Sequence, residues 1–165
     1  MKKDHIKDYA THAFEEYSRR GCPTRKECEE KIRGNVIKSM FGQDPKVIAT
    51  TADHVVKNME PLLKDIDAAI STLEELERKN KGYISGAVRA VYFVNANENL
   101  NLRIIRSRVL MYSMTIHADE RTVYRWLQEA RALFAVKRGM NIVEKQDDFT
   151  DRWIDSSIVG SNDKV

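Results

Sequence analysis

The chain has 165 residues, of which 42% are hydrophobic, and this is enough for one domain or two small ones around a modest core. Its 28 lysines and arginines exceed its 25 acidic residues by only three, so binding to a polyanion would depend on local clusters of charge. No apolar run approaches the roughly 20 residues that a membrane-spanning helix needs, and the N-terminal residues lack the apolar core of a signal peptide. We therefore expect a cytoplasmic protein with two free thiols and no membrane segment.

Apolar residues recur at intervals of three and four almost throughout, and alternating apolar and polar runs are nearly absent. This pattern predicts an all-α fold. We expect the first helix to run from about His5 to Arg20. Thr24 and Glu27 have the spacing of a capping box, and they begin a second helix that ends before Gly42.

A third helix begins where Asp44 can serve as N-cap and Pro45 can take the first helical position, and it reaches roughly Met59. The next apolar stripe has the alternating spacing of a coiled-coil seam and consists of Leu62, Ile66, Ala69, Leu73 and Leu76. The stripe covers only about two heptads, so either another helix of this chain or a second subunit must cover it. The polar run "ERKNKG", which ends at Gly82, predicts a domain boundary.

Positive charge is concentrated between Leu100 and Met140, a stretch that contains eight lysines and arginines and only three acidic residues. Within this stretch, Asp119 can cap a helix whose inward stripe consists of Val123, Trp126, Leu127, Ala130, Leu133 and Phe134. The opposite side of that helix carries arginines and a glutamine. A turn of three to four residues around His117 joins it to the preceding amphipathic helix, which is the spacing of a helix-turn-helix.

The segment "ADERTVYRWLQEARALFA" resembles the recognition helix of bacterial helix-turn-helix regulators, in particular the sigma-factor region-four-like domains of phage transcriptional regulators of the ArpU and RinA type. The resemblance covers only the C-terminal part of the chain. It implies a three-helix DNA-binding domain over residues 82–140 that controls phage or mobile-element genes. His117 stands where the turn of that family usually has glycine, so this position needs either a left-handed backbone or a somewhat different turn.

The rest of the chain is expected to serve this domain. Residues 1–81 would form an N-terminal helical module for assembly or dimerisation, and residues 141–165 an acidic tail. The tail could compete with DNA for the basic face, or it could simply pack or stay disordered. Because one motif contacts one half-site, we expect a homo-oligomer, with a dimer favoured, or a partner such as RNA polymerase.

Two sets of side chains would contact double-stranded DNA. Those expected to read base edges are Glu120, Arg121, Tyr124, Arg125 and Gln128. Those expected to hold phosphates are Arg103, Arg106, Arg108, Arg131, Lys137 and Arg138. Trp126 is expected in the core, together with four methionines on apolar faces, namely Met40, Met59, Met111 and Met114.

Other interpretations of the basic helix stay open. The chain could be a DNA-packaging subunit similar to a small terminase, a helical adaptor whose arginine face binds an acidic protein, or a protein in which this face is merely solvated. The histidines and cysteines of the N-terminal part fit no closed zinc pattern, and we find no nucleophile motif, phosphate-binding loop or pair of catalytic carboxylates. We therefore expect no enzymatic activity, no metal and no cofactor.

Overall fold

The structure is a computed structural model that describes the backbone of residues 5–140 and the side chains of residues 9–140. Within that range the chain is all-α, which confirms the predicted fold class. The described helices are α1 (His5–Arg19), α2 (Arg25–Ser39), α3 (Pro45–Asn58), α4 (Glu60–Arg78), α5 (Gly82–Tyr92), α6 (Leu102–Ile116) and α7 (Glu120–Arg138). None of these helices combines the length and the apolar character needed to cross a bilayer. The acidic tail, residues 141–165, lies outside the described residues.

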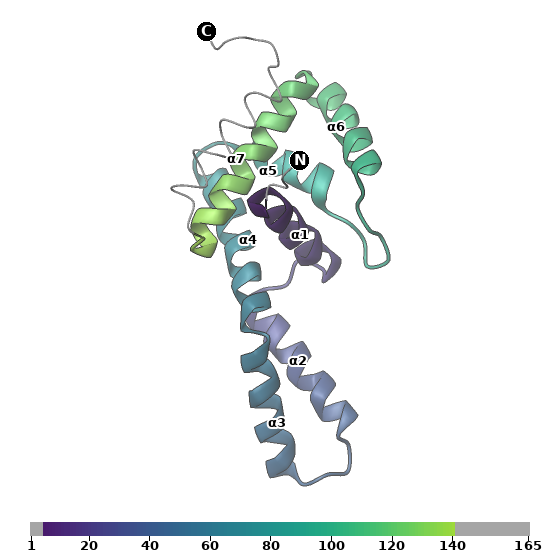
Figure 1. Cartoon of the computed structure of the whole chain (residues 1–165), viewed down its shortest axis with the longest axis vertical. Coiled ribbons are helices and arrows are strands. Elements are labelled where there is room, and N and C mark those ends of the chain that lie inside the picture. The colour runs from purple at the N-terminus through teal and green to yellow at the C-terminus, as the bar shows by residue number, and fades with distance from the viewer. Residues whose placement is uncertain (1–4, 141–165) are drawn as a thin grey trace.

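The helices form a body and a projecting hairpin (Figure 1). The body contains α1, α4, α5, α6 and α7, while α2 and α3 pack against each other and extend away from it. The predicted N-terminal capping interactions are present at both helices of the hairpin. Thr24 forms a complete capping box with Glu27, and the Asp44 side chain accepts a hydrogen bond from the Lys46 N–H before Pro45 opens α3.

The hairpin is fixed to the body at its base. Arg25, the first residue of α2, forms ion pairs with Glu60 and Asp67 of α4, each with an N to O distance of 2.6 Å. The two carboxylates raise the pKa of this guanidinium by accepting its hydrogen bonds. On the other side, α3 runs into α4 with a single break at Met59, which is followed by Pro61 in the first turn of α4. A proline fits there because the first turn of a helix does not need its N–H.

The seam of α4 is covered by helices of the same chain. Ile66, Ala69, Leu73 and Leu76 are all buried, Leu62 is half-buried, and α4 packs against α1 and α7. The two possibilities left open by the sequence are thus resolved in favour of intramolecular packing. A single cluster of buried side chains extends from α1 and α4 through α5 to α7, so the core crosses the boundary that the polar run near Gly82 predicted.

Phe14 lies at the centre of this core. Its ring is fully buried and contacts Phe134 of α7 at 5.4 Å and Tyr92 of α5 at 6.2 Å between ring centroids. Aromatic pairs at these separations add to the free energy gained by burial. One side chain of α1 therefore joins three helices of the body.

We expect Phe14→Ala to lower the free energy of unfolding by about 3–5 kcal/mol, because it leaves a cavity at the contact of three helices. Urea denaturation followed by circular dichroism would measure the change. Leu102→Ala, at an exposed position of α6, is the matched control and should change stability by less than about 0.5 kcal/mol. Equal stabilities for the two variants would contradict this description of the core.

Candidate nucleic-acid interface

The connection between α6 and α7 is short and well defined. His117 follows α6 with φ 58° and ψ 46°, a left-handed backbone, and the N–H groups of His117 and Ala118 both donate to the Ser113 carbonyl. Asp119 then caps α7 by accepting a hydrogen bond from the Thr122 N–H at 2.8 Å. This backbone hydrogen bond is the main cause that lowers the pKa of Asp119. Of the two conformations that the sequence allowed at His117, the chain adopts the left-handed one.

One face of α7 is completely enclosed. Val123, Leu127, Ala130 and Phe134 have no exposed surface, which agrees with the predicted inward stripe. Trp126 lies at the edge of that stripe, half-buried, and its ring meets the ring of Tyr83 of α5 at 4.8 Å in an edge-on arrangement. Because this face is enclosed, only residues on the opposite side of α7 are free to contact a partner.

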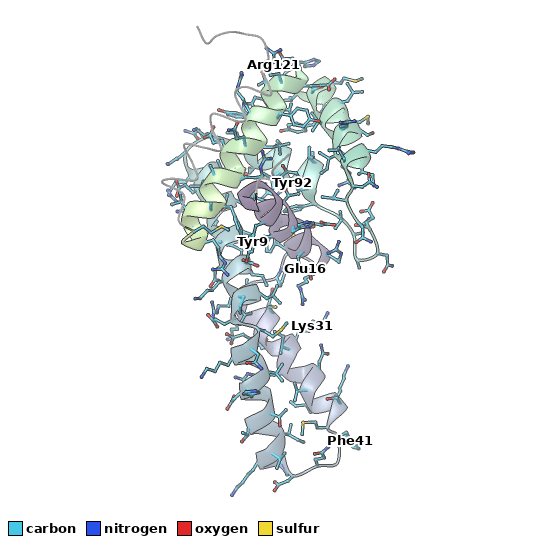
Figure 2. The ribbon with its side chains drawn as sticks, viewed as in Figure 1. Tyr9, Glu16, Lys31, Phe41, Tyr92 and Arg121 are labelled. Carbon is cyan, nitrogen blue, oxygen red and sulfur yellow. The ribbon has the colours of Figure 1, made fainter. Side chains whose placement is uncertain are left out.

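The five residues expected to read base edges lie in the N-terminal half of α7. Arg121, Arg125 and Glu120 are exposed, and Tyr124 and Gln128 are half-buried. The Arg125 guanidinium donates to the Thr122 hydroxyl at 3.3 Å, a long contact that holds it only weakly. Arg121 and Arg125 therefore form an exposed basic row near the beginning of α7. Arg121 lies at the end of the molecule far from Phe41 (Figure 2).

Tyr124 lies between this row and α6. Burial raises the pKa of its hydroxyl, with a further raising effect from the charge of Glu120 and an opposing one from Arg106 of α6. The hydroxyl is therefore protonated at neutral pH and can donate a hydrogen bond. The influence of Arg106 also shows that α6 contributes positive charge beside α7.

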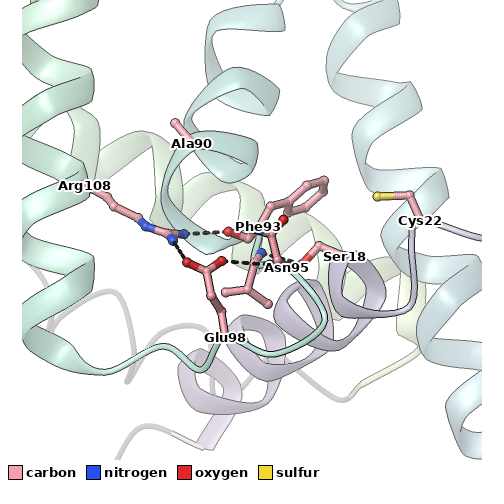
Figure 3. A pocket seen from close by; sticks show the side chains of 8 residues that line it. Ser18, Cys22, Ala90, Phe93, Asn95, Glu98 and Arg108 are labelled. Atoms are coloured by element: carbon pink, nitrogen blue, oxygen red, sulfur yellow. Dashed lines mark hydrogen bonds and ion pairs between the residues drawn. The ribbon is translucent and has the colours of Figure 1, made fainter.

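The arginines of α6 divide into two kinds. Arg103 and Arg106 are exposed, and within the described part of the chain neither takes part in an ion pair. Arg108 is turned inward, where its guanidinium donates to the Phe93 carbonyl at 2.5 Å and pairs with Glu98 at 3.4 Å (Figure 3). Arg108 thus holds the segment between α5 and α6 in place, and it is not presented to a ligand.

Three cations of α7 that were expected to hold phosphates are also directed toward the body. The prediction for Arg131 is wrong, because its side chain is only 1% exposed and donates to the Tyr92 hydroxyl. Lys137 pairs with Glu75 of α4 at 2.5 Å, and Arg138 pairs with Asp65 of α4 at 2.7 Å. Arg103 and Arg106 are thus the members of the predicted phosphate set that the structure leaves exposed and unpaired within the described residues.

The outward face of α6 carries apolar side chains that the sequence analysis assigned to the core. Met111 and Met114 are each 63% exposed, so the expectation of a filling role is wrong for these two, and Leu110 beside them is exposed as well. Met40 and Met59 are half-buried. The exposed trio follows Arg103 and Arg106 along the same helix, which gives α6 a basic end and an apolar end.

A hollow of about 450 Å³ lies between the end of α1 and the segment that follows α5 (Figure 3). Its polar groups are satisfied by one another, since the Ser18 hydroxyl accepts from the Val94 N–H at 2.9 Å and Glu98 accepts from the Asn95 N–H at 2.8 Å. Burial raises the pKa of the Cys22 thiol at its edge, with an opposing effect from Arg89. The thiol is therefore protonated near neutral pH and is not an activated nucleophile.

Comparison with family models, with curated proteins and with solved structures finds no match for this chain. The features of the chain that bear on its function are therefore its own. They are the basic row of α7, the exposed arginines of α6 and the turn between these two helices. Among the described residues, no group of three histidine, cysteine or acidic side chains is arranged to hold a metal ion.

The ion pair between Lys137 of α7 and Glu75 of α4 predicts that the stability of the protein depends on pH. Hydrogen bonds from Lys137 and then Lys79 lower the pKa of Glu75 from 4.5 to about 2. The stabilisation is therefore fully present above pH 4.5 and is lost as the pH falls through 2. We expect Glu75→Gln to have a lower Tm than the unmodified protein at pH 7, and this difference in Tm should shrink as the pH approaches 2. Glu74→Gln, next to it but exposed, should show no such convergence, and a Tm difference for Glu75→Gln that is independent of pH would contradict the assignment.

Proposed function

We propose that the protein binds double-stranded DNA, with α6 and α7 acting as a helix-turn-helix and α7 entering the major groove. The observation that carries the proposal is the exposed row of Arg121 and Arg125, which lies opposite a fully enclosed stripe and directly after a three-residue turn. A helix with one enclosed face and long donors at its exposed N-terminal half has the form that major-groove recognition requires. The resemblance of "ADERTVYRWLQEARALFA" to regulators of the ArpU and RinA type supports the same interpretation.

Five residues in the N-terminal half of α7 would share the contacts with DNA. Arg121 and Arg125 can each donate two hydrogen bonds to a guanine, and Gln128 can bond the edge of an adenine. Glu120, in the first turn, can accept a hydrogen bond from the amino group of a cytosine. Tyr124 would donate its hydroxyl proton to a phosphate oxygen beside the groove.

Phosphate contacts would come from α6. Arg103 and Arg106 are exposed in the first half of α6, whereas Arg108, Arg131, Lys137 and Arg138 are engaged with the body and would not touch DNA. The logarithm of the binding constant falls with the logarithm of the salt concentration by about 0.9 for each neutralised phosphate. The tyrosine hydroxyl is uncharged and does not count, so a chain that uses two arginines for phosphates would have a slope of about −2.

In the cell, we infer that this contact serves the regulation of phage or mobile-element genes, in the cytoplasm and together with RNA polymerase. The basis is the resemblance, which is to transcriptional regulators. A DNA-packaging subunit would use the same helix pair, and the size of the assembly would separate the two, since packaging subunits form rings.

Selection of binding sites from random duplexes, repeated with variants, would test the DNA contact. Arg125→Ala should lose about 1–3 kcal/mol of binding free energy and relax the preference at one position of the site. Arg106→Ala should weaken binding to all sequences alike and make the salt slope shallower by about 0.9. Lys31→Ala, which removes a positive charge from the hairpin far from Arg121, is the control and should change neither quantity (Figure 2).

Two results would contradict this assignment of roles. Equal loss on all sequences for Arg125→Ala would make that residue a phosphate contact. Failure of the unmodified protein to bind any duplex at any salt concentration would exclude DNA as the ligand of this face.

A second candidate function is a helical adaptor that binds an acidic protein. It is favoured by the exposed trio Leu110, Met111 and Met114, because apolar side chains beside arginines are typical of protein interfaces. Titration of the unmodified protein with duplexes separates the two candidates, because an adaptor would bind none. If the protein binds DNA, Met111→Ser combined with Met114→Ser should keep the duplex affinity and the salt slope within about twofold.

A further inference from the structure

The α2–α3 hairpin contains less buried apolar surface than the rest of the chain. Within it, only Cys28, Ile32 and Ala52 are buried, whereas α4 alone buries a whole stripe. The hairpin also stands apart from the body over most of its length (Figure 1). Two short helices that bury so few side chains are marginal in water, so a further layer on this hairpin would stabilise it.

Phe41 projects from the tip of the hairpin. It follows the end of α2, it is 90% exposed, and Figure 2 shows it at the end of the molecule opposite Arg121. Ile37 and Val47, on either side of the tip, are also exposed. A phenylalanine with this exposure gains nothing from folding within its own chain, but it gains free energy when a partner covers it.

An apolar groove lies beside this phenylalanine. It has a volume of about 400 Å³, and the residues that line it are Arg33, Ile37, Pro45, Ile48, Ala49 and Ala52. Arg33 is the one charged residue among them, and its guanidinium is paired with Asp53 at 2.7 Å. The small side chains of Ala49 and Ala52 leave room for an aromatic ring from outside. Phe41 itself is not among the lining residues, although Ile37 and Pro45 are only four residues away from it on either side.

We propose that the hairpin is a self-association surface, in which Phe41 of one copy occupies the groove between α2 and α3 of a second copy, and the reverse. A projecting ring and an apolar groove at the same tip make the surface self-complementary, which is the condition for a two-fold symmetric dimer. This inference does not depend on the proposed DNA binding.

Charge and the use of other apolar surfaces favour a second copy as the occupant. The hairpin, residues 24–58, carries seven lysines and arginines interspersed with five acidic residues. Two copies can therefore approach each other without strong electrostatic repulsion between like charges. The α4 seam, the other apolar stripe that a second subunit could have covered, is already enclosed by α1 and α7. The hairpin tip and the trio Leu110, Met111 and Met114 of α6 remain as apolar surfaces that a second copy can cover without opening the body, and the tip is the one that pairs a projecting ring with an apolar groove.

Measurement of mass against concentration by light scattering or sedimentation would test the dimer. The unmodified full chain should form dimers, and Phe41→Ser should raise the dimer dissociation constant by at least about a hundredfold, because two rings lose their cover in each dimer. Phe41 is nearly fully exposed, so this variant should keep the Tm of the monomer. Leu102→Ser, an exposed apolar position on α6, is the matched control and should leave the dissociation constant unchanged.

Cross-linking between two different chains would test the pairing of ring and groove. In a background with Cys22→Ser, which removes the exposed native thiol, chains with Gln43→Cys, an exposed tip position that keeps the Phe41 ring, are mixed with chains that carry Ala49→Cys. Mild oxidation should join these two chains, whereas chains with Gln43→Cys and chains with Leu102→Cys should not be joined. Cross-linking that is equal in both mixtures would overturn the proposed contact.

Three mass results would also overturn it. They are a monomer at all concentrations, a dimer that Phe41→Ser does not weaken, and a ring larger than a dimer. A monomer would leave the groove to a different protein. Each of these results is independent of DNA, so a failure of the dimer is distinguishable from a failure of the DNA contact.

Discussion

The contact of Phe14 with Phe134 and Tyr92 determines the orientation of α7, and the exposed surface of that helix follows from it. With Phe134 held against α1, the stripe that begins at Val123 must face the body, and the arginines half a turn away must face outward. The ion pairs from Lys137 and Arg138 to α4 act in the same direction at the other end of the helix. The basic row is thus positioned by contacts that α7 makes with α1, α4 and α5, most of them at the far end of the helix.

Signals that act over a few residues could be read from the sequence. The capping box at Thr24, the proline that opens α3 and the cap at Asp119 each require only backbone and side-chain groups within one turn, and all three are present. The inward stripe of α7 could be predicted for the same reason, because the periodicity of one helix determines which residues share a face. The left-handed conformation at His117 was one of two that the sequence allowed, and the choice depends on how α6 and α7 pack.

What depends on several helices at once could not be predicted. On a helical wheel Arg131 lies at the flank of α7, and only the position of α5 decides that this flank is closed by Tyr92. Met111 and Met114 lie on an apolar face of α6 that no other described helix covers. Their exposure therefore depends on where the other helices pack, and the sequence of α6 alone does not reveal it. The polar run before Gly82 ends a helix correctly, but it gives no information on whether the core continues beyond it.

The break between α3 and α4 has a mechanical consequence. Around Met59 the backbone hydrogen bonds from Met59 to Val55 and from Leu63 to Met59 are kept, so the two helices form a nearly continuous rod from Pro45 to Arg78. At 1.5 Å per residue this rod is about 50 Å long. Its far part is packed against α7, and Arg25 clamps its middle. A load applied at the tip would bend the rod most easily at the break around Met59, because Pro61 has no N–H with which to continue the hydrogen bonds of α3 into α4. The stiffness of this joint, together with the clamp by Arg25, sets how much of the motion reaches α7.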